Sequence, residues 1–143
     1  EAALGAYLEA HWPGFRGPVK AEKFAGGQSN PTFMLSHADG RAVLRKKPPG
    51  QLLKSAHAVD REYRVMKALG GTAVPVPKMH VLCEDESVIG TAFYVMEFVD
   101  GRIIWDPAIP EVSQADRTAI YDAMNAAEGR ITRYLGLPPR RAA

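Results

Sequence analysis

The segment from Phe24 to Asn30 combines residue types that can bind a polyphosphate. Its two adjacent glycines would let backbone N–H groups approach phosphate oxygens, because a Cβ would block the approach and some such positions need a positive φ. The side chains that follow could add donors, so the candidate phosphate contacts are Gly26, Gly27, Gln28, Ser29 and Asn30. The chain has no Gly-Lys-Ser or Gly-Lys-Thr, which excludes a Walker motif. A plain turn without a ligand is the alternative that the loop alone leaves open.

Arg45 ends an apolar run that follows this loop, and it is the candidate phosphate-binding cation. A cation beside a glycine loop needs an acid that holds it in place, as the lysine–glutamate pair of protein kinases shows. Glu62 is the candidate, because it borders the apolar face of a predicted helix. Read alone, Glu62 could instead be an exposed charge, and Arg45 a plain edge-strand charge. Lys46 is a second candidate cation, but adjacent strand residues point to opposite faces of a sheet.

A long apolar run, 91–99, ends in an acidic residue and a glycine, as a connector between two lobes would. Its backbone N–H and C=O groups near the end of the run could pair with the edge of an adenine ring. The residues expected there are Met96, Glu97, Phe98 and Val99. An ordinary core strand is the alternative.

The elements that must position these residues follow from turn signals and from the spacing of apolar residues. Two short strands flank the glycine loop, and the Asp39-Gly40 turn leads to a returning strand, which predicts an antiparallel meander. The helix that carries Glu62 is predicted to run from an N-cap at Ser55 to about Leu69. The remaining expected elements are a helix over 3–12, strands over 19–24, 32–35, 41–45, 79–83 and 91–99, and a helix over 114–128.

Two helices carry further signals. The stripe Val59, Tyr63, Met66 and Leu69 has the i, i+4, i+7 spacing of a buried helix face. Ser113, three residues before Asp116, is a capping-box pattern for the last helix. Residues 129–143 have no clear period and are rich in Arg and Pro, so we expect an irregular tail.

Composition sets limits on the class of protein. A chain of 143 residues is about one domain, and its 46% apolar content is ordinary for a globular protein. The net charge of +2 is too small to argue for a nucleic-acid partner. No apolar stretch approaches the roughly 20 residues of a membrane span, so we expect no membrane partner. The single cysteine, Cys83, excludes an internal disulfide and favours a reducing, cytoplasmic location.

Four motifs, taken in order, make a family resemblance specific. They are Phe24-Ala25-Gly26-Gly27-Gln28-Ser29-Asn30-Pro31-Thr32-Phe33, Val43-Leu44-Arg45-Lys46-Lys47-Pro48-Pro49-Gly50, His57-Ala58-Val59-Asp60-Arg61-Glu62-Tyr63-Arg64-Val65 and Tyr94-Val95-Met96-Glu97-Phe98-Val99-Asp100-Gly101-Arg102. Together they resemble the N-terminal lobe of the aminoglycoside phosphotransferase/choline kinase-like superfamily, from about residue 4 to residue 125. The most similar branch is the one also found fused to acyl-CoA dehydrogenase-like proteins.

The resemblance implies an α+β, protein-kinase-like N-lobe: an antiparallel sheet of about five strands with one packed helix, preceded by an N-terminal helix. It implies ATP and Mg²⁺ as cofactors. It assigns phosphate contacts to the 26–30 loop, an α-phosphate cation to Arg45 and the partner carboxylate to Glu62. Adenine contacts fall to the backbone of 97–99. Arg45 stands where many members have lysine.

The resemblance also implies a division of the chain. Residues 1–101 correspond to the ATP-binding lobe with its hinge, 102–128 to a connector and the first helix of a second lobe, and 129–143 to the irregular tail. The family's catalytic His-Gly-Asp with its following Asn does not occur in the sequence, nor does a second metal-binding aspartate. No catalytic or metal-ligating residue is therefore assigned, and we expect the chain alone to be inactive.

Three functions remain open at this stage. The first is the ATP-binding lobe of a kinase that phosphorylates a small-molecule hydroxyl. The second is a non-catalytic, pseudokinase-like nucleotide-binding module, and the third is a ligand-free interaction domain. The acceptor is undetermined, since an aminoglycoside, a choline-like alcohol or a hydroxyacyl thioester would all be compatible. Because an isolated lobe would leave apolar residues uncovered, we also expect a tendency to self-associate.

Overall fold

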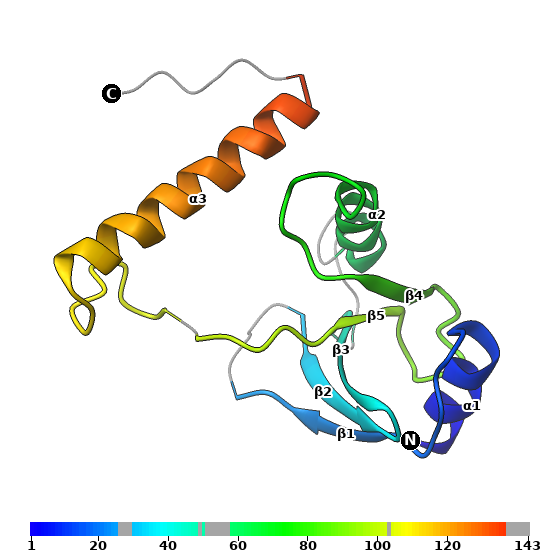
Figure 1. Ribbon diagram of the computed structural model, residues 1–143. Helices are drawn as coiled ribbons and strands as arrows, with labels where there is room; N and C mark the ends of the chain where they lie inside the picture. Colours follow the sequence, from blue (N-terminus) through cyan, green and yellow to red (C-terminus); the bar gives the residue numbers. More distant parts are fainter. Residues whose placement is uncertain (26–29, 49, 51–57, 103, 137–143) are drawn as a thin grey trace. The chain divides into compact units, whose positions relative to one another are not determined.

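The computed structural model describes residues 1–25, 30–48, 50, 58–102 and 104–136. Its centre is a five-stranded antiparallel sheet with the spatial order β1-β2-β3-β5-β4 (Figure 1). The strands are β1 (Lys20–Lys23), β2 (Thr32–His37), β3 (Gly40–Lys46), β4 (Met79–Cys83) and β5 (Phe93–Glu97). This arrangement confirms the expected α+β fold and the meander of the first three strands.

Two helices pack on opposite faces of the sheet. Side chains alternate between faces along each strand, so neighbours in β5 enter different cores. Phe93 lies in a cluster with Leu4 and Leu8 of α1 (Ala2–His11). The next residue, Tyr94, lies in a second cluster with residues of α2 (Val59–Leu69). The sheet is therefore the middle layer of a helix–sheet–helix arrangement.

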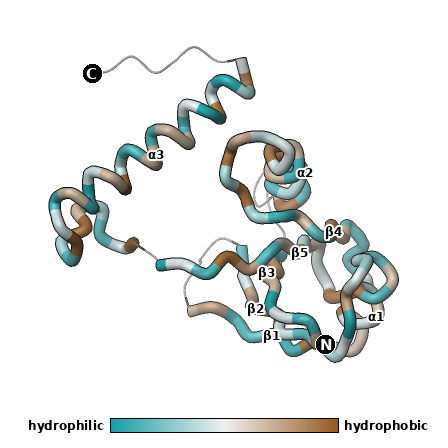
Figure 2. The backbone as a smooth tube through the Cα atoms, viewed as in Figure 1, coloured by the Kyte–Doolittle hydropathy of each residue, from teal (hydrophilic) through white to brown (hydrophobic). Residues whose placement is uncertain are grey.

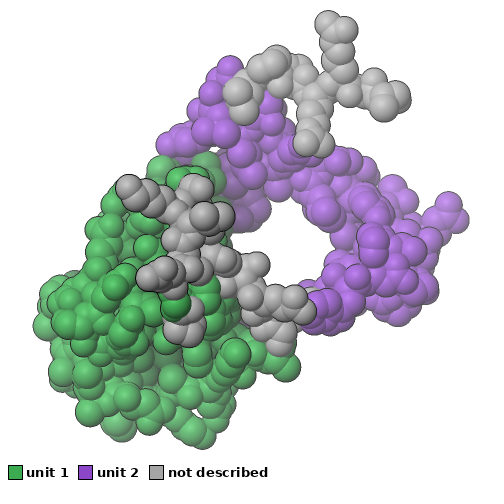
Figure 3. Space-filling view, turned by 180° about the vertical axis from the view of Figure 1, so that it is seen from behind, with its two compact units in different colours: residues 1–71, 76–99 green, residues 72–75, 100–143 purple. Residues whose placement is uncertain are grey.

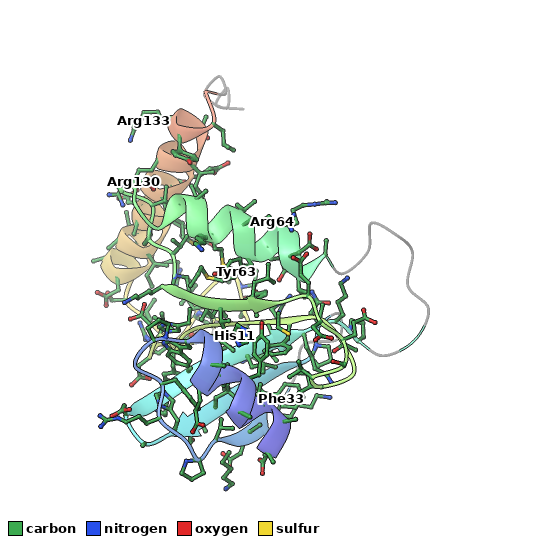
Figure 4. The ribbon with its side chains drawn as sticks, turned by 90° about the vertical axis from the view of Figure 1, so that its right-hand side faces the viewer. His11, Phe33, Tyr63, Arg64, Arg130 and Arg133 are labelled. Carbon is green, nitrogen blue, oxygen red and sulfur yellow. The ribbon has the colours of Figure 1, made fainter. Side chains whose placement is uncertain are left out.

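The apolar stripe of α2 faces the sheet as predicted. Val59, Tyr63 and Leu69 are buried, and Met66 is half-buried against the same cluster. Tyr63 lies between α2 and the sheet (Figure 4). The helix begins at Val59, with Ala58 at its N-cap, while the predicted N-cap at position 55 lies outside the described residues.

The tight turn between β2 and β3 sits one residue earlier than predicted. His37 pairs with Gly40, so the two loop residues are Ala38 and Asp39. Gly40 is the first residue of β3, and its φ of +145° is one that residues with a side chain rarely adopt.

The chain divides into two compact units, residues 1–71 with 76–99 and residues 72–75 with 100–143 (Figure 3). The second unit contains α3 (Gln114–Tyr134), whose N-cap Ser113 accepts a hydrogen bond from the Asp116 N–H at 3.1 Å. The predicted cap is thus confirmed. Hydrophilic and hydrophobic residues are interspersed along α3, and none of its side chains is buried (Figure 2).

The expected irregular tail is wrong for its first residues, since α3 continues through Gly129 to Tyr134. One glycine inside a helix costs only about 1 kcal/mol relative to alanine, which its helix-forming neighbours offset. The stop signal lies further on, at Gly136, whose φ of +64° and N–H bond to the Arg133 carbonyl end the helix. Positions 137–143 of the expected tail lie outside the described residues.

Large apolar side chains are exposed in the second unit. Trp105 is 79% exposed and Met124 is 59% exposed. Among the residues that the structure describes, no helix combines the length and the apolar character that a membrane crossing requires.

An aromatic cluster joins the end of α1 to the sheet. The Trp12 ring stacks on His80 of β4 at a centroid distance of 4.1 Å and lies edge-on to His37 of β2 at 5.3 Å. Burial lowers the pKa of the His80 imidazole below its ordinary value, and Lys78 lowers it further, while Glu97 opposes the shift. The folded chain therefore favours the neutral form of His80.

This preference predicts a pH-dependent stability. Because the unfolded chain takes up a proton on His80 at a higher pH, near 6.5, the free energy of unfolding should fall as the pH falls below that value. The loss should level off once the pH is below the lowered folded pKa. Urea unfolding between pH 7.5 and pH 5 measures it, and His80→Gln should flatten the profile. If the exposed control His11→Gln flattens it equally, His80 is not the group responsible.

Candidate functional site

Three polar side chains form a row across the sheet on the face that α2 covers. Thr32 of β2 is the Cα partner of Arg45 of β3, and Arg45 is in turn the partner of Tyr94 of β5. Directly paired residues of neighbouring strands point to the same face. Since Tyr94 lies in the α2-side cluster, Thr32 and Arg45 project to that side as well.

Glu62 of α2 reaches this row and accepts hydrogen bonds from three described side chains. Arg45 Nε donates to Glu62 Oε2 at 2.9 Å, and the Tyr94 hydroxyl donates to the same oxygen at 3.0 Å. Asn30 Nδ2 donates to the other oxygen, Oε1, at 3.2 Å. The predicted contact between Arg45 and Glu62 is therefore present, as an ion pair with two further donors around the carboxylate.

Thr32 connects the cation to the end of the glycine loop. Arg45 Nη1 donates to Thr32 Oγ1 at 3.2 Å, and Thr32 Oγ1 donates to the Asn30 carbonyl at 3.1 Å. Asn30 is only 3% exposed. Its side-chain amide thus supports Glu62 in this structure, whereas the sequence suggested a direct phosphate donor.

The surroundings of the Tyr94 hydroxyl keep it protonated, so that it can donate a hydrogen bond. Burial raises the pKa of the Tyr94 hydroxyl above its ordinary value, and the neighbouring Glu62 carboxylate raises it further. The hydroxyl therefore stays protonated at neutral pH. The side chains of Arg45 and Glu62 are 30% and 36% exposed, so solvent screens their attraction.

A second row on the same face is apolar. Met34 of β2 pairs with Val43 of β3, which pairs with Met96 of β5. Val43 is buried, while Met34 and Met96 are half-buried. Each of these residues lies two positions along its strand from the polar row, which is about 6.8 Å. An apolar strip thus borders the cation on one face of the sheet.

The end of β5 already makes hydrogen bonds to the residue before β4. The Glu97 N–H donates to the Lys78 carbonyl at 2.8 Å, and the Lys78 N–H donates to Glu97 Oε2 at 3.0 Å. An adenine contact through the Glu97 backbone would therefore have to use its carbonyl oxygen. Phe98 lies under the Arg41 guanidinium, 4.2 Å from the ring centroid, and Val99 is 62% exposed.

Not all of the predicted site residues can be placed. Gly26, Gly27, Gln28 and Ser29 lie outside the described residues. The alternative cation, Lys46, is the Cα partner of Phe93, which packs in the α1-side cluster, so Lys46 projects away from Glu62.

Sequence reasoning missed four members of the two rows: Thr32, Tyr94, Met34 and Val43. Each lies inside a predicted strand, but only the register of strand pairing reveals that it shares a row with a site residue. A hairpin register counted from the predicted Asp39-Gly40 turn would have paired Met34 with Arg45. The observed turn, one residue earlier, pairs Thr32 with Arg45 and Met34 with Val43.

Among the residues that the structure describes, no group of three or more His, Cys, Asp or Glu side chains could hold a metal ion. Glu62 is a poor ligand, because its two oxygens already accept three hydrogen bonds. Two cavities, of about 440 Å³ beside Gly5 and Gly17 and about 340 Å³ beside Arg102 and Ile109, share no residue with the cluster.

The phosphotransferase enzyme family model matches residues 20–142 of this chain. The chain belongs to this family. The crystal structure of a candidate aminoglycoside phosphotransferase from Ralstonia eutropha JMP134 is 53% identical and superposes with a TM-score of 0.77, over 90% of this chain and 36% of that one. The match confirms the kinase-like N-lobe fold that the sequence motifs implied.

Several similar proteins are named as acyl-CoA dehydrogenases. Their similarity confirms the predicted resemblance to the branch that is fused to acyl-CoA dehydrogenase-like proteins. Acyl-CoA dehydrogenase family member 11 of Rattus norvegicus is 52% identical over 123 residues, 83% of this chain and 16% of its own length. The Arabidopsis thaliana protein named Probable acyl-CoA dehydrogenase IBR3 is 59% identical over 109 residues, 73% of this chain and 13% of its own length. The chain thus spans less than a fifth of these relatives.

The ion pair predicts a small coupling in stability. Because both side chains are about one-third exposed, the coupling free energy between Arg45 and Glu62 should be about 1 kcal/mol or less. A double-mutant cycle with Arg45→Met and Glu62→Gln, read by urea unfolding, measures it. A coupling of several kcal/mol would contradict the screened geometry. The exposed pair Arg64 and Glu84, 3.1 Å apart, is the matched control cycle and should couple less.

Proposed function

We propose that this chain is the ATP-binding lobe of a phosphotransferase that moves the γ-phosphate of ATP to a small-molecule hydroxyl. The observation that carries the proposal is the Arg45–Glu62 pair, held on the sheet face beside the apolar row of Met34, Val43 and Met96. In kinases, a cation held by a helix glutamate binds the phosphates. Membership of the phosphotransferase family points the same way.

In this proposal each row binds one part of the nucleotide. The apolar row lies against the adenine ring, and the Glu97 carbonyl with the backbone of Phe98 and Val99 reads the edge of the ring. Arg45 contacts the phosphates, together with the backbone N–H groups of the glycine loop, 26–30. Mg²⁺ enters with ATP and neutralises phosphate charge when bound. The ATP-binding lobe ends at residue 101 in this proposal, and residues 102–128 are the connector and part of the first helix of a second lobe.

The dehydrogenase names of the relatives are not carried over to this chain. It covers 13–16% of the length of the two relatives compared, and both the family model and the solved structure concern phosphotransferases. The acceptor is a hydroxyl compound of undetermined class. A reducing, cytoplasmic setting fits ATP as a ligand and the buried, free thiol of Cys83.

Catalysis by this chain is a separate matter from nucleotide binding. Phosphoryl transfer needs a carboxylate that orients the acceptor hydroxyl, and the sequence has no His-Gly-Asp to provide it. Glu62 is occupied by three donors and is not available for that role. The chain alone would therefore hold ATP without consuming it, which is also what a pseudokinase-like module would do.

Calorimetry with Mg·ATP tests the proposal on the purified chain. We expect saturable binding, weakened about fivefold to tenfold by Glu62→Ala, because the variant releases Arg45 from its oriented position. A factor of ten corresponds to about 1.4 kcal/mol. Glu84→Ala, an exposed glutamate, should bind as the parent does. The same samples should release no ADP above background in a coupled assay.

Absence of ATP binding by the folded parent chain would reject the proposal. Clear ADP release that depends on an alcohol acceptor would contradict the prediction that the chain alone is inactive. It would not contradict the proposed nucleotide site.

A further inference from the structure

The Tyr94 hydroxyl is a donor to Glu62 that the fold holds in a buried position. Tyr94 is 1% exposed, and its ring lies in the α2-side cluster with Val59 and Ala92, 6.1 Å from the Tyr63 ring. Close-packed core side chains have little freedom to move. The position of the hydroxyl is therefore set by the core and needs no bound nucleotide.

Glu62 depends on such a fixed donor. Its side chain is 36% exposed, so packing alone does not determine its rotamer. Oε2 accepts from both Tyr94 and Arg45, and Oε1 accepts from the buried Asn30. Buried donors from β5 and from the end of the glycine loop thus hold the carboxylate on two sides.

An arginine makes stricter demands on its partners than a lysine would. The guanidinium is planar with five N–H donors in a fixed fork, so two bonds in different directions set its plane. Arg45 makes two such bonds, from Nε to Glu62 and from Nη1 to Thr32. Movement of Glu62 would turn the whole guanidinium, whereas a lysine ammonium would only shift.

We propose that Tyr94 is a positioning residue for triphosphate recognition, which acts by fixing Glu62 so that the Arg45 guanidinium is oriented toward the nucleotide phosphates. Thr32 is the second member of this arrangement and sets the same plane from β2. The inference rests on the proposed ATP-binding function. Tyr94 touches neither phosphate nor base in this arrangement, and its effect passes through Glu62 and Arg45.

The test compares ligands that differ only in their phosphates. Tyr94→Phe removes the hydroxyl and keeps the ring, so it should weaken binding of Mg·ATP about threefold to tenfold, the range that corresponds to one lost hydrogen bond. Binding of adenosine should change less than twofold, because the apolar row is intact. ADP and AMP should fall between the two. Calorimetry or a competed fluorescent nucleotide gives the four affinities.

Two further variants complete the design. Tyr63→Phe changes another buried tyrosine of the same cluster and should leave the ATP-to-adenosine affinity ratio unchanged. Thr32→Val keeps the shape of a strand residue, removes the acceptor of Arg45 Nη1 and should reproduce the phosphate-specific loss. It serves as the test if thermal melts show that Tyr94→Phe does not fold.

The outcomes separate the two claims. If ATP and adenosine weaken equally in Tyr94→Phe, or if neither changes, the positioning role is wrong even though the chain binds ATP. If the parent chain binds neither ligand, the proposed function itself fails and the inference fails with it.

Discussion

The carboxylate of Glu62 is the interaction on which the candidate site depends. Three side chains from three different segments donate to it: Asn30 after the glycine loop, Arg45 from β3 and Tyr94 from β5. Without the carboxylate, the Arg45 guanidinium on β3 would lose the partner of its Nε, and α2 would lose its hydrogen bonds to Asn30, Arg45 and Tyr94. The net stability from these bonds is small because the pair is partly exposed. Their main effect is to fix the orientation of the Arg45 guanidinium.

The sheet places the residues around Glu62 in ordered rows on one face. Antiparallel register places Thr32, Arg45 and Tyr94 in one row and Met34, Val43 and Met96 in the next on the same face. The polar row, which contains Arg45, lies beside the apolar row. This arrangement would suit a ligand that has phosphates at one end and a flat apolar ring at the other. On the opposite face, Leu44, Phe93 and Val95 pack into the α1-side cluster. Strand alternation therefore separates the α1-side cluster on one face from the α2-side cluster and the two rows on the other.

How far the sequence could predict this varies from residue to residue. Arg45 and Glu62 could be found because their order along the chain and the apolar stripe of α2 depend on local patterns. Tyr94 could not be singled out within the apolar run 91–99, since its contact with Glu62 depends on which residues of β3 and β5 are paired, and that register is a tertiary property. Gly129 does not end α3, because its helix-forming neighbours outweigh the weak helix propensity of one residue, so the predicted end at 128 was too early.

We propose that the row of Met34, Val43 and Met96 contacts the adenine ring while Arg45 contacts the phosphates. The chain has five methionines, and two of them lie in that row, so methyl NMR reports on it directly. Resonances can be assigned with single Met→Leu variants and followed during a titration with Mg·ATP. We predict that the Met34 and Met96 methyl signals shift and saturate with the binding curve, and that adenosine shifts the same two signals. Saturable ATP binding that leaves both signals in place would contradict the account, because the base would then lie elsewhere.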